Sequence, residues 1–81
     1  MARPSKRAQS EAAPVAFGRA VRAIRLEQGL TQEGLSHQAE IDRSYMGGIE
    51  RGEHNVALIY IHRVANALGV TIAELMTRAR L

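Results

Sequence analysis

The chain has 81 residues, a formal net charge of +3, and neither cysteine nor tryptophan. This length predicts one small domain, and the lack of cysteine excludes disulfides and thiolate metal sites. Residues 1–13 hold three basic side chains and one acidic one, a net charge of +2, which leaves +1 for residues 14–81. Most of the basic charge therefore lies at the N-terminus, and composition alone argues only weakly for a nucleic-acid partner.

No apolar run approaches the roughly 18 residues that a membrane span needs, and no apolar segment of a secretory signal follows the basic N-terminus. We therefore expect a cytoplasmic protein without a membrane partner. Residues 1–13 are small, polar and basic, and predict a flexible basic N-terminal arm that is either inert or reaches DNA. Residues 14–81 are expected to form the folded domain.

The first predicted helix starts at Pro14 and ends before Gly29. Two short helices are predicted next, with Thr31 and Asp42 as their N-caps and Gly52 after the second of them. The helical spacing of apolar residues predicts the buried positions of these three helices, which are Phe17, Val21, Ile24, Leu35, Ala39, Met46 and Ile49.

A fourth helix is predicted between an N-cap at Asn55 and a stop at Gly69. Its expected inner stripe consists of Leu58, Ile61, Val64, Ala65 and Leu68. A fifth helix opens with a capping box formed by Thr71 and Glu74. No segment alternates with period two for long enough to form a strand, so the predicted fold class is all-α with five helices.

The stretch from Thr31 to Arg51 contains two short helices joined by a tight connection, which is the layout of a helix-turn-helix. The second of these helices presents Arg43 and Ser44 at its N-terminal end. Arginine can bond guanine O6 and N7 together, and serine is an adaptable partner for base edges. Gly47 and Gly48 each cost about 0.5–1 kcal/mol relative to alanine, so they are either tolerated or needed for close approach to another surface.

The segment GLTQEGLSHQAEIDRSYMGGIERG resembles the lambda-repressor/Cro-like (XRE-type) helix-turn-helix, and the resemblance extends over about residues 15–76. The segment DRSYMGGIERGEHN is also similar to the controller proteins of restriction–modification systems. The resemblance implies a five-helix DNA-binding domain that acts on a double-stranded operator.

The resemblance also implies a role for individual positions. It places base readout at Arg43, Ser44, Tyr45, Gly47 and Gly48. It places contacts with the DNA backbone at Gln32, Arg51, His54 and Asn55, and a structural salt bridge between Arg25 and Glu50. For Tyr45 a packing role at the rim of the fold stays open beside the DNA contact.

Three departures from the family pattern affect these expectations. Glu40 stands in the turn where the family usually has glycine, and a left-handed backbone there would cost about 1–2 kcal/mol. Gly47 stands where a side chain often reads bases, so sequence preference would depend more on DNA shape. His54 replaces a residue that is often basic in the controller-like relatives, and an unperturbed histidine is mostly uncharged at neutral pH.

Nothing in the sequence predicts an enzyme, a metal site or a cofactor. The three histidines, His37, His54 and His62, lack metal-ligand spacing, and no phosphate-binding glycine loop is present. The small core favours a homodimer, with an interface expected on the last two helices at Ile59, Tyr60, Leu75 and Met76.

The sequence therefore predicts a sequence-specific DNA-binding transcriptional regulator that acts as a homodimer on a roughly palindromic operator. A controller protein of a restriction–modification system is one such regulator, and it would block or recruit RNA polymerase. The alternative is a protein-interaction module, antitoxin-like or adaptor, that uses the same fold.

Overall fold

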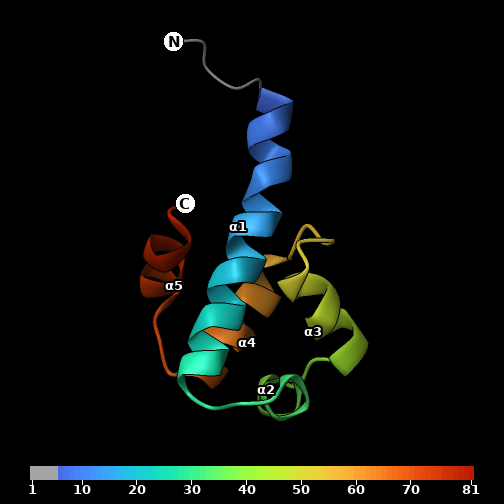
Figure 1. Ribbon diagram of the computed structural model, residues 1–81, viewed down its shortest axis with the longest axis vertical. Coiled ribbons are helices and arrows are strands. Elements are labelled where there is room, and N and C mark those ends of the chain that lie inside the picture. The colour runs from blue at the N-terminus through green and yellow to red at the C-terminus, as the bar shows by residue number, and fades with distance from the viewer. Residues whose placement is uncertain (1–5) are drawn as a thin grey trace.

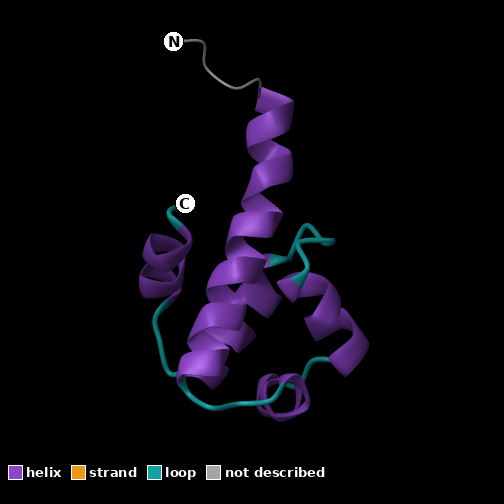
Figure 2. Cartoon of the chain, viewed as in Figure 1, coloured by secondary structure: helices purple, strands orange, loops and turns teal. Residues whose placement is uncertain are grey.

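The computed structural model describes the backbone of residues 6–81 and the side chains of residues 12–81. This part of the chain contains five helices and no strand (Figures 1 and 2). The predicted all-α, five-helix fold class is confirmed. The helices are α1 (Lys6–Glu27), α2 (Gln32–Ala39), α3 (Arg43–Glu50), α4 (Leu58–Leu68) and α5 (Ile72–Ala79).

Helix α1 is the centre of the bundle. It packs against α3 on one side and α5 on the other, and α4 lies behind it in Figure 1. Helix α2 packs against α3 and α4. The N-terminal turns of α1 extend beyond the other helices, so the molecule measures 42 × 22 × 20 Å.

Helix α1 begins at Lys6, eight residues before the predicted start at Pro14. Residues 6–13, expected to belong to a flexible arm, are thus helical, and residues 1–5 of that arm lie outside the described residues. The early start has a physical reason, since these residues are mostly good helix formers. Apolar periodicity detects only helices with a buried face, and this segment has no such pattern.

Three of the predicted helix starts are confirmed by their hydrogen bonds. The Gly34 amide donates to Thr31 Oγ1 over 2.9 Å, and the Tyr45 amide donates to Asp42 Oδ2 over 3.3 Å. Thr71 and Glu74 form the predicted capping box at the start of α5. These caps satisfy amides that the first turn of a helix leaves without intrahelical partners.

The predicted start of α4 is wrong in two respects. Its N-cap is Ala57 rather than Asn55, and no side chain caps it. Leu58, the first residue of α4, is 71% exposed, although the stripe predicted it to be buried. Of the rest of the stripe, Val64, Ala65 and Leu68 are buried as expected, and Ile61 is half-buried against the core.

Gly18 on α1 lies at a close contact between α1 and α3. A Cβ atom at this position would lie 2.2 Å from the carbonyl oxygen of Ile49 and 2.7 Å from that of Glu50. Real Cβ atoms do not come so close to backbone atoms. The absence of a side chain at position 18 therefore lets α1 lie directly on the C-terminal end of α3.

Glu40, the C-cap of α2, adopts the left-handed conformation with φ 56° and ψ 45°. Replacing Glu40 by glycine is expected to raise the free energy of unfolding by about 1 kcal/mol, because glycine enters this region without the strain that a Cβ atom causes. Urea unfolding measures the difference. The matched control is Glu33→Gly inside α2, which should lower stability by about 1 kcal/mol. A loss of stability in Glu40→Gly would contradict the strain argument.

Among residues 6–81, no single helix has both the length and the apolar character of a membrane span. Only α4 and α5 taken together pass that test, with a bend of 95° between them.

Candidate nucleic-acid interface

Helices α2 and α3 are joined by a three-residue turn from Glu40 to Asp42. The Ile41 amide donates to the carbonyl of Ser36 over 2.9 Å, and the Ile41 side chain is buried. This turn fixes the angle between the two helices, so α3 follows α2 in a defined orientation. Two short helices held this way define a helix-turn-helix.

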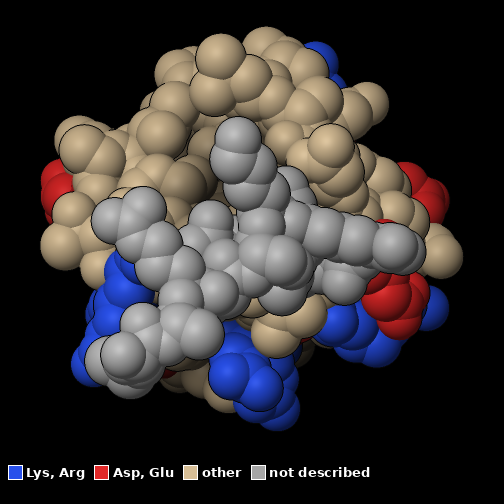
Figure 3. All heavy atoms as spheres, turned by 90° about the horizontal axis from the view of Figure 1, so that it is seen from above, with Lys and Arg blue, Asp and Glu red and all other residues tan. Residues whose placement is uncertain are grey.

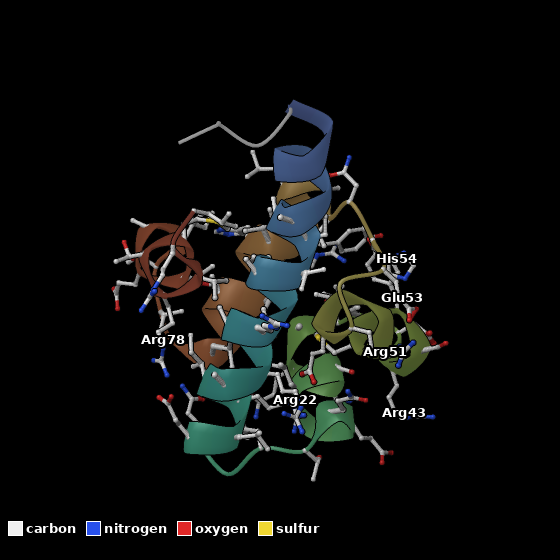
Figure 4. The ribbon with its side chains drawn as sticks, turned by 45° about the horizontal axis from the view of Figure 1, so that its top comes forward. Arg22, Arg43, Arg51, Glu53, His54 and Arg78 are labelled. Atoms are coloured by element: carbon white, nitrogen blue, oxygen red, sulfur yellow. The ribbon has the colours of Figure 1, made fainter. Side chains whose placement is uncertain are left out.

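The N-terminal end of α3 faces solvent through Arg43 and Ser44, both exposed. In Figure 4 the Arg43 side chain points away from the body of the protein. These are the two positions expected to read bases directly, and the structure leaves their side chains available for a groove of DNA.

Tyr45 is half-buried and forms part of a series of ring contacts. Its ring stacks on His54 at 4.6 Å between centroids, with 27° between the planes. On its other side it meets Tyr60 of α4 at 5.3 Å, and the Arg63 guanidinium lies over Tyr60 at 5.5 Å. The packing role left open for Tyr45 is therefore present in the structure, and its contact with DNA remains a prediction.

Gly47 and Gly48 were expected among the base-reading positions; both are buried in the protein by itself, and their contact with DNA remains a prediction. A Cβ atom at Gly48 would lie 2.3 Å from Nε2 of His54. At Gly47 it would lie 3.0 Å from Nη1 of Arg51. The lack of a side chain at Gly48 therefore makes room for the imidazole ring of His54 in the same protein.

The predicted salt bridge between Arg25 and Glu50 is present and buried. Arg25 Nε donates to Glu50 Oε2 over 2.7 Å and Nη2 donates to Oε1 over 2.9 Å, while Nη1 bonds the Leu30 carbonyl. The hydrogen bond to Glu50 raises the pKa of the Arg25 guanidinium above its usual value. This pair ties α1 to the end of α3 and so helps to hold α3 in position.

Gln32 also bonds Glu50, its Nε2 donating to Oε1 over 3.0 Å. The amide expected to hold a DNA phosphate is thus already bound within the protein. A side-chain amide has two N–H donors, and the backbone amides at the N-terminus of α2 carry a partial positive charge. The phosphate contact of Gln32 therefore remains a prediction.

Arg51 and Glu53 form an exposed ion pair just after α3. Arg51 Nε donates to Glu53 Oε2 over 2.7 Å, and Nη2 donates to Oε1 over 3.3 Å. The hydrogen bond from Arg51 lowers the pKa of the Glu53 carboxyl, and the same bond raises the pKa of Arg51. The carboxylate therefore offsets the charge that Arg51 would offer to a DNA backbone.

Replacing Glu53 by glutamine is expected to strengthen DNA binding, because it frees the Arg51 guanidinium for a phosphate. If Arg51 gains one phosphate contact, the slope of log affinity against log salt should steepen by about 0.9. Acidification should act in the same direction, since the pair is lost as pH falls through the lowered pKa of Glu53. Fluorescence anisotropy over a salt series measures the first effect, and the same measurement over a pH series measures the second.

The matched control is Glu27→Gln, which breaks the exposed Arg78–Glu27 pair on the other flank of α1. Its salt slope should equal that of the unaltered protein. An equal slope in Glu53→Gln would remove Arg51 from the DNA contacts.

The other expected backbone residues lie near the same end of α3. His54 is half-buried against Tyr45 and Gly48, and Asn55 is exposed in the loop before α4. Asn55 does not cap α4, so the predicted N-cap role is wrong. Its contact with the DNA backbone remains a prediction.

Sequence reasoning missed two features of this site. The steric need for Gly18 has no local signal, because its contacts come from α3. The Glu53 carboxylate lies two residues after Arg51, and that short separation was a usable signal for an ion pair. Within residues 12–81 no group of three or more potential metal-ligating side chains occurs.

The fold and the exposed end of α3 define a helix-turn-helix domain, and comparisons with known proteins agree. The family model described as helix-turn-helix matches residues 21–75. Control protein C.MunI of a Mycoplasma species is 34% identical over 64 residues, which cover 78% of this chain and 86% of the relative. Control protein C.BamHI of Bacillus amyloliquefaciens is 41% identical, over 74% of this chain and 75% of the relative.

A crystal structure of the restriction–modification controller protein C.AhdI from Aeromonas hydrophila is also similar. It superimposes with a TM-score of 0.77 at 45% identity, over 79% of this chain and 97% of that one. The chain belongs to the helix-turn-helix family, which consists of DNA-binding transcription regulators and is not an enzyme family.

Proposed function

We propose that this protein is a cytoplasmic transcriptional regulator that binds a roughly palindromic operator as a homodimer, as a restriction–modification controller protein does. The observation that carries this proposal is the exposed Arg43–Ser44 pair at the start of a helix that a buried ion pair holds in place. Regulation would follow from blocking or recruiting RNA polymerase at the operator.

Variants of one relative fall at three consecutive residues similar in type to Arg43, Ser44 and Tyr45. Solved structures of the restriction–modification controller protein C.Esp1396I include variants in which an arginine, a threonine and a tyrosine at consecutive positions were each replaced. Arg43, Ser44 and Tyr45 follow one another in a closely similar order of residue types. Serine and threonine offer the same hydroxyl to a base edge.

An uncharged, apolar surface at α4 supports the proposed homodimer. In Figure 3 the basic side chains gather at the lower edge, whereas the upper half is mostly uncharged. Leu58 and Ile59 of α4 are 71% and 54% exposed, and together with His62 and Ile72 they line an apolar groove. A second copy that covers this surface would remove it from water.

The expected dimer residues divide into two groups. Ile59 is exposed, and Tyr60 and Met76 are half-buried, so these three can contribute to an interface. Leu75 is completely buried in the protomer's own core, which corrects its assignment to the interface. Leu58 belongs in the proposed interface instead.

Selection from a random pool of duplex DNA at physiological salt tests the proposed function. Enrichment of a two-fold symmetric site, with half-sites about 34 Å apart, is the expected outcome. If the folded protein enriches no sequence, the DNA-binding proposal fails and the protein-interaction alternative takes its place.

Replacing Arg43 by alanine is expected to weaken binding to the selected site by about 1–3 kcal/mol and to relax base preference at one position per half-site. Repeating the selection with the variant measures the second effect directly. Arg80→Ala is the control, since Arg80 is an exposed arginine outside α2 and α3. Unchanged preference in Arg43→Ala would exclude Arg43 from base readout.

A further inference from the structure

A basic groove lies between α1 and the C-terminal end of α5, with a volume of about 350 Å³. Three exposed arginines line it, Arg19 from α1 with Arg78 and Arg80 from the end of α5. The rest of the lining consists of alanines, among them Ala16 and Ala23, and it includes no acidic side chain.

This groove is separate from the candidate DNA interface. In Figure 4 Arg78 lies on one flank of α1, whereas Arg43 and Arg51 lie on the other. Helix α1 packs against both α3 and α5, so it stands between the two surfaces. We therefore expect the basic groove to bind a partner other than the DNA segment that α3 would read.

The arginines indicate an anionic partner with planar, two-oxygen groups, because a guanidinium binds carboxylate and phosphate through paired hydrogen bonds. The same face already holds one carboxylate, since Arg78 bonds Glu27 of α1. Among residues 12–81 no recorded ion pair involves Arg19 or Arg80. These two guanidiniums are placed to bind further carboxylates in the way that Arg78 binds Glu27.

The alanines that line the groove favour a peptide over a nucleic acid as its partner. Ala16 and Ala23 lie one turn before and one turn after Arg19, so apolar methyl groups flank the charge along α1. A phosphate backbone has few apolar groups to place there, whereas a peptide with small apolar residues between its carboxylates has them at the required spacing.

We propose that this groove binds an acidic peptide segment of a protein partner. Its carboxylates pair with Arg19 and Arg80, and its apolar side chains lie on the alanines between them. The protein would then contact DNA on one side of α1 and a second protein on the other. This second contact does not depend on the proposed DNA-binding function.

A fluorescein-labelled peptide of Glu, Ala and Leu tests the proposal by fluorescence anisotropy at physiological salt, beside a peptide in which Gln replaces every Glu. Arg19→Glu should weaken binding of the acidic peptide about tenfold or more, as expected for hydrogen bonds between charged groups. The matched control is Arg22→Glu, which makes the same charge change one turn further along α1, outside the groove lining. The control should have little effect because exposed charges are screened by salt.

Equal loss in Arg19→Glu and Arg22→Glu would overturn the proposal in favour of general charge attraction. Displacement of the peptide by duplex DNA of unrelated sequence would overturn it in favour of a phosphate-binding surface, and absence of peptide binding would also overturn it. Arg43→Glu separates the two functions, because it should abolish operator binding and leave peptide binding intact.

Discussion

Replacing Gly18 by alanine is expected to lower the free energy of unfolding by about 3 kcal/mol, the upper end of the usual cost of overpacking. The new Cβ atom would meet backbone carbonyls of α3, which cannot rotate away as a side chain can. A domain of 81 residues is expected to have a total stability of about 4–12 kcal/mol. Urea or thermal unfolding would therefore show a large loss.

Gly34→Ala is the control for this prediction. Gly34 lies inside α2, and its only close neighbour would be the Thr31 hydroxyl at 3.2 Å. Alanine is the better helix former, but the Thr31 hydroxyl must give way by a few tenths of an ångström, so the stability should change by no more than about 1 kcal/mol in either direction. If Gly18→Ala were as stable as Gly34→Ala, the close approach of α1 to α3 would not exist in solution.

The second large effect is expected at the buried pair of Arg25 and Glu50. Replacing Glu50 by alanine leaves a buried guanidinium without its carboxylate and should cost about 3–5 kcal/mol. The same variant removes the partner of Gln32, so the start of α2 loses a contact as well. Chemical unfolding measures the loss.

A double variant separates the cost of an unpaired charge from the value of the pair itself. Arg25→Met combined with Glu50→Leu removes both charges, and such replacements of buried pairs are often neutral in stability. We expect the double variant to recover most of the stability that Glu50→Ala loses. A double variant as unstable as the single one would show that the pair itself stabilises the fold.

The parts of the fold that the sequence predicted correctly are those that depend on neighbouring residues. Thr31, Asp42 and the Thr71 capping box mark helix starts because each side chain bonds an amide three residues later. The ion pair of Arg25 and Glu50 was expected from the family resemblance, since no local pattern connects residues 25 apart.

The wrong predictions concern residues whose surroundings depend on segments distant in the sequence. Leu58 fits the apolar stripe of α4, but no other helix covers that end of it. Gly48 lies on the outer face of α3 by periodicity alone, yet the chain returns after α3 and places His54 over it. The start of α1 was missed for the opposite reason, because helix propensity continues there without apolar periodicity in the sequence.

The contact between His54 and Gly48 limits how this protein could acquire a new DNA sequence preference. A Cβ atom added at position 48 would lie 2.3 Å from Nε2 of His54, so the imidazole would have to shift from its place against Tyr45. Replacing His54 by a smaller residue would remove this obstacle, and it would also remove the stacking partner of Tyr45. Positions 48 and 54 should therefore vary together among descendants of this sequence, whereas Arg43 and Ser44 are free to change one at a time.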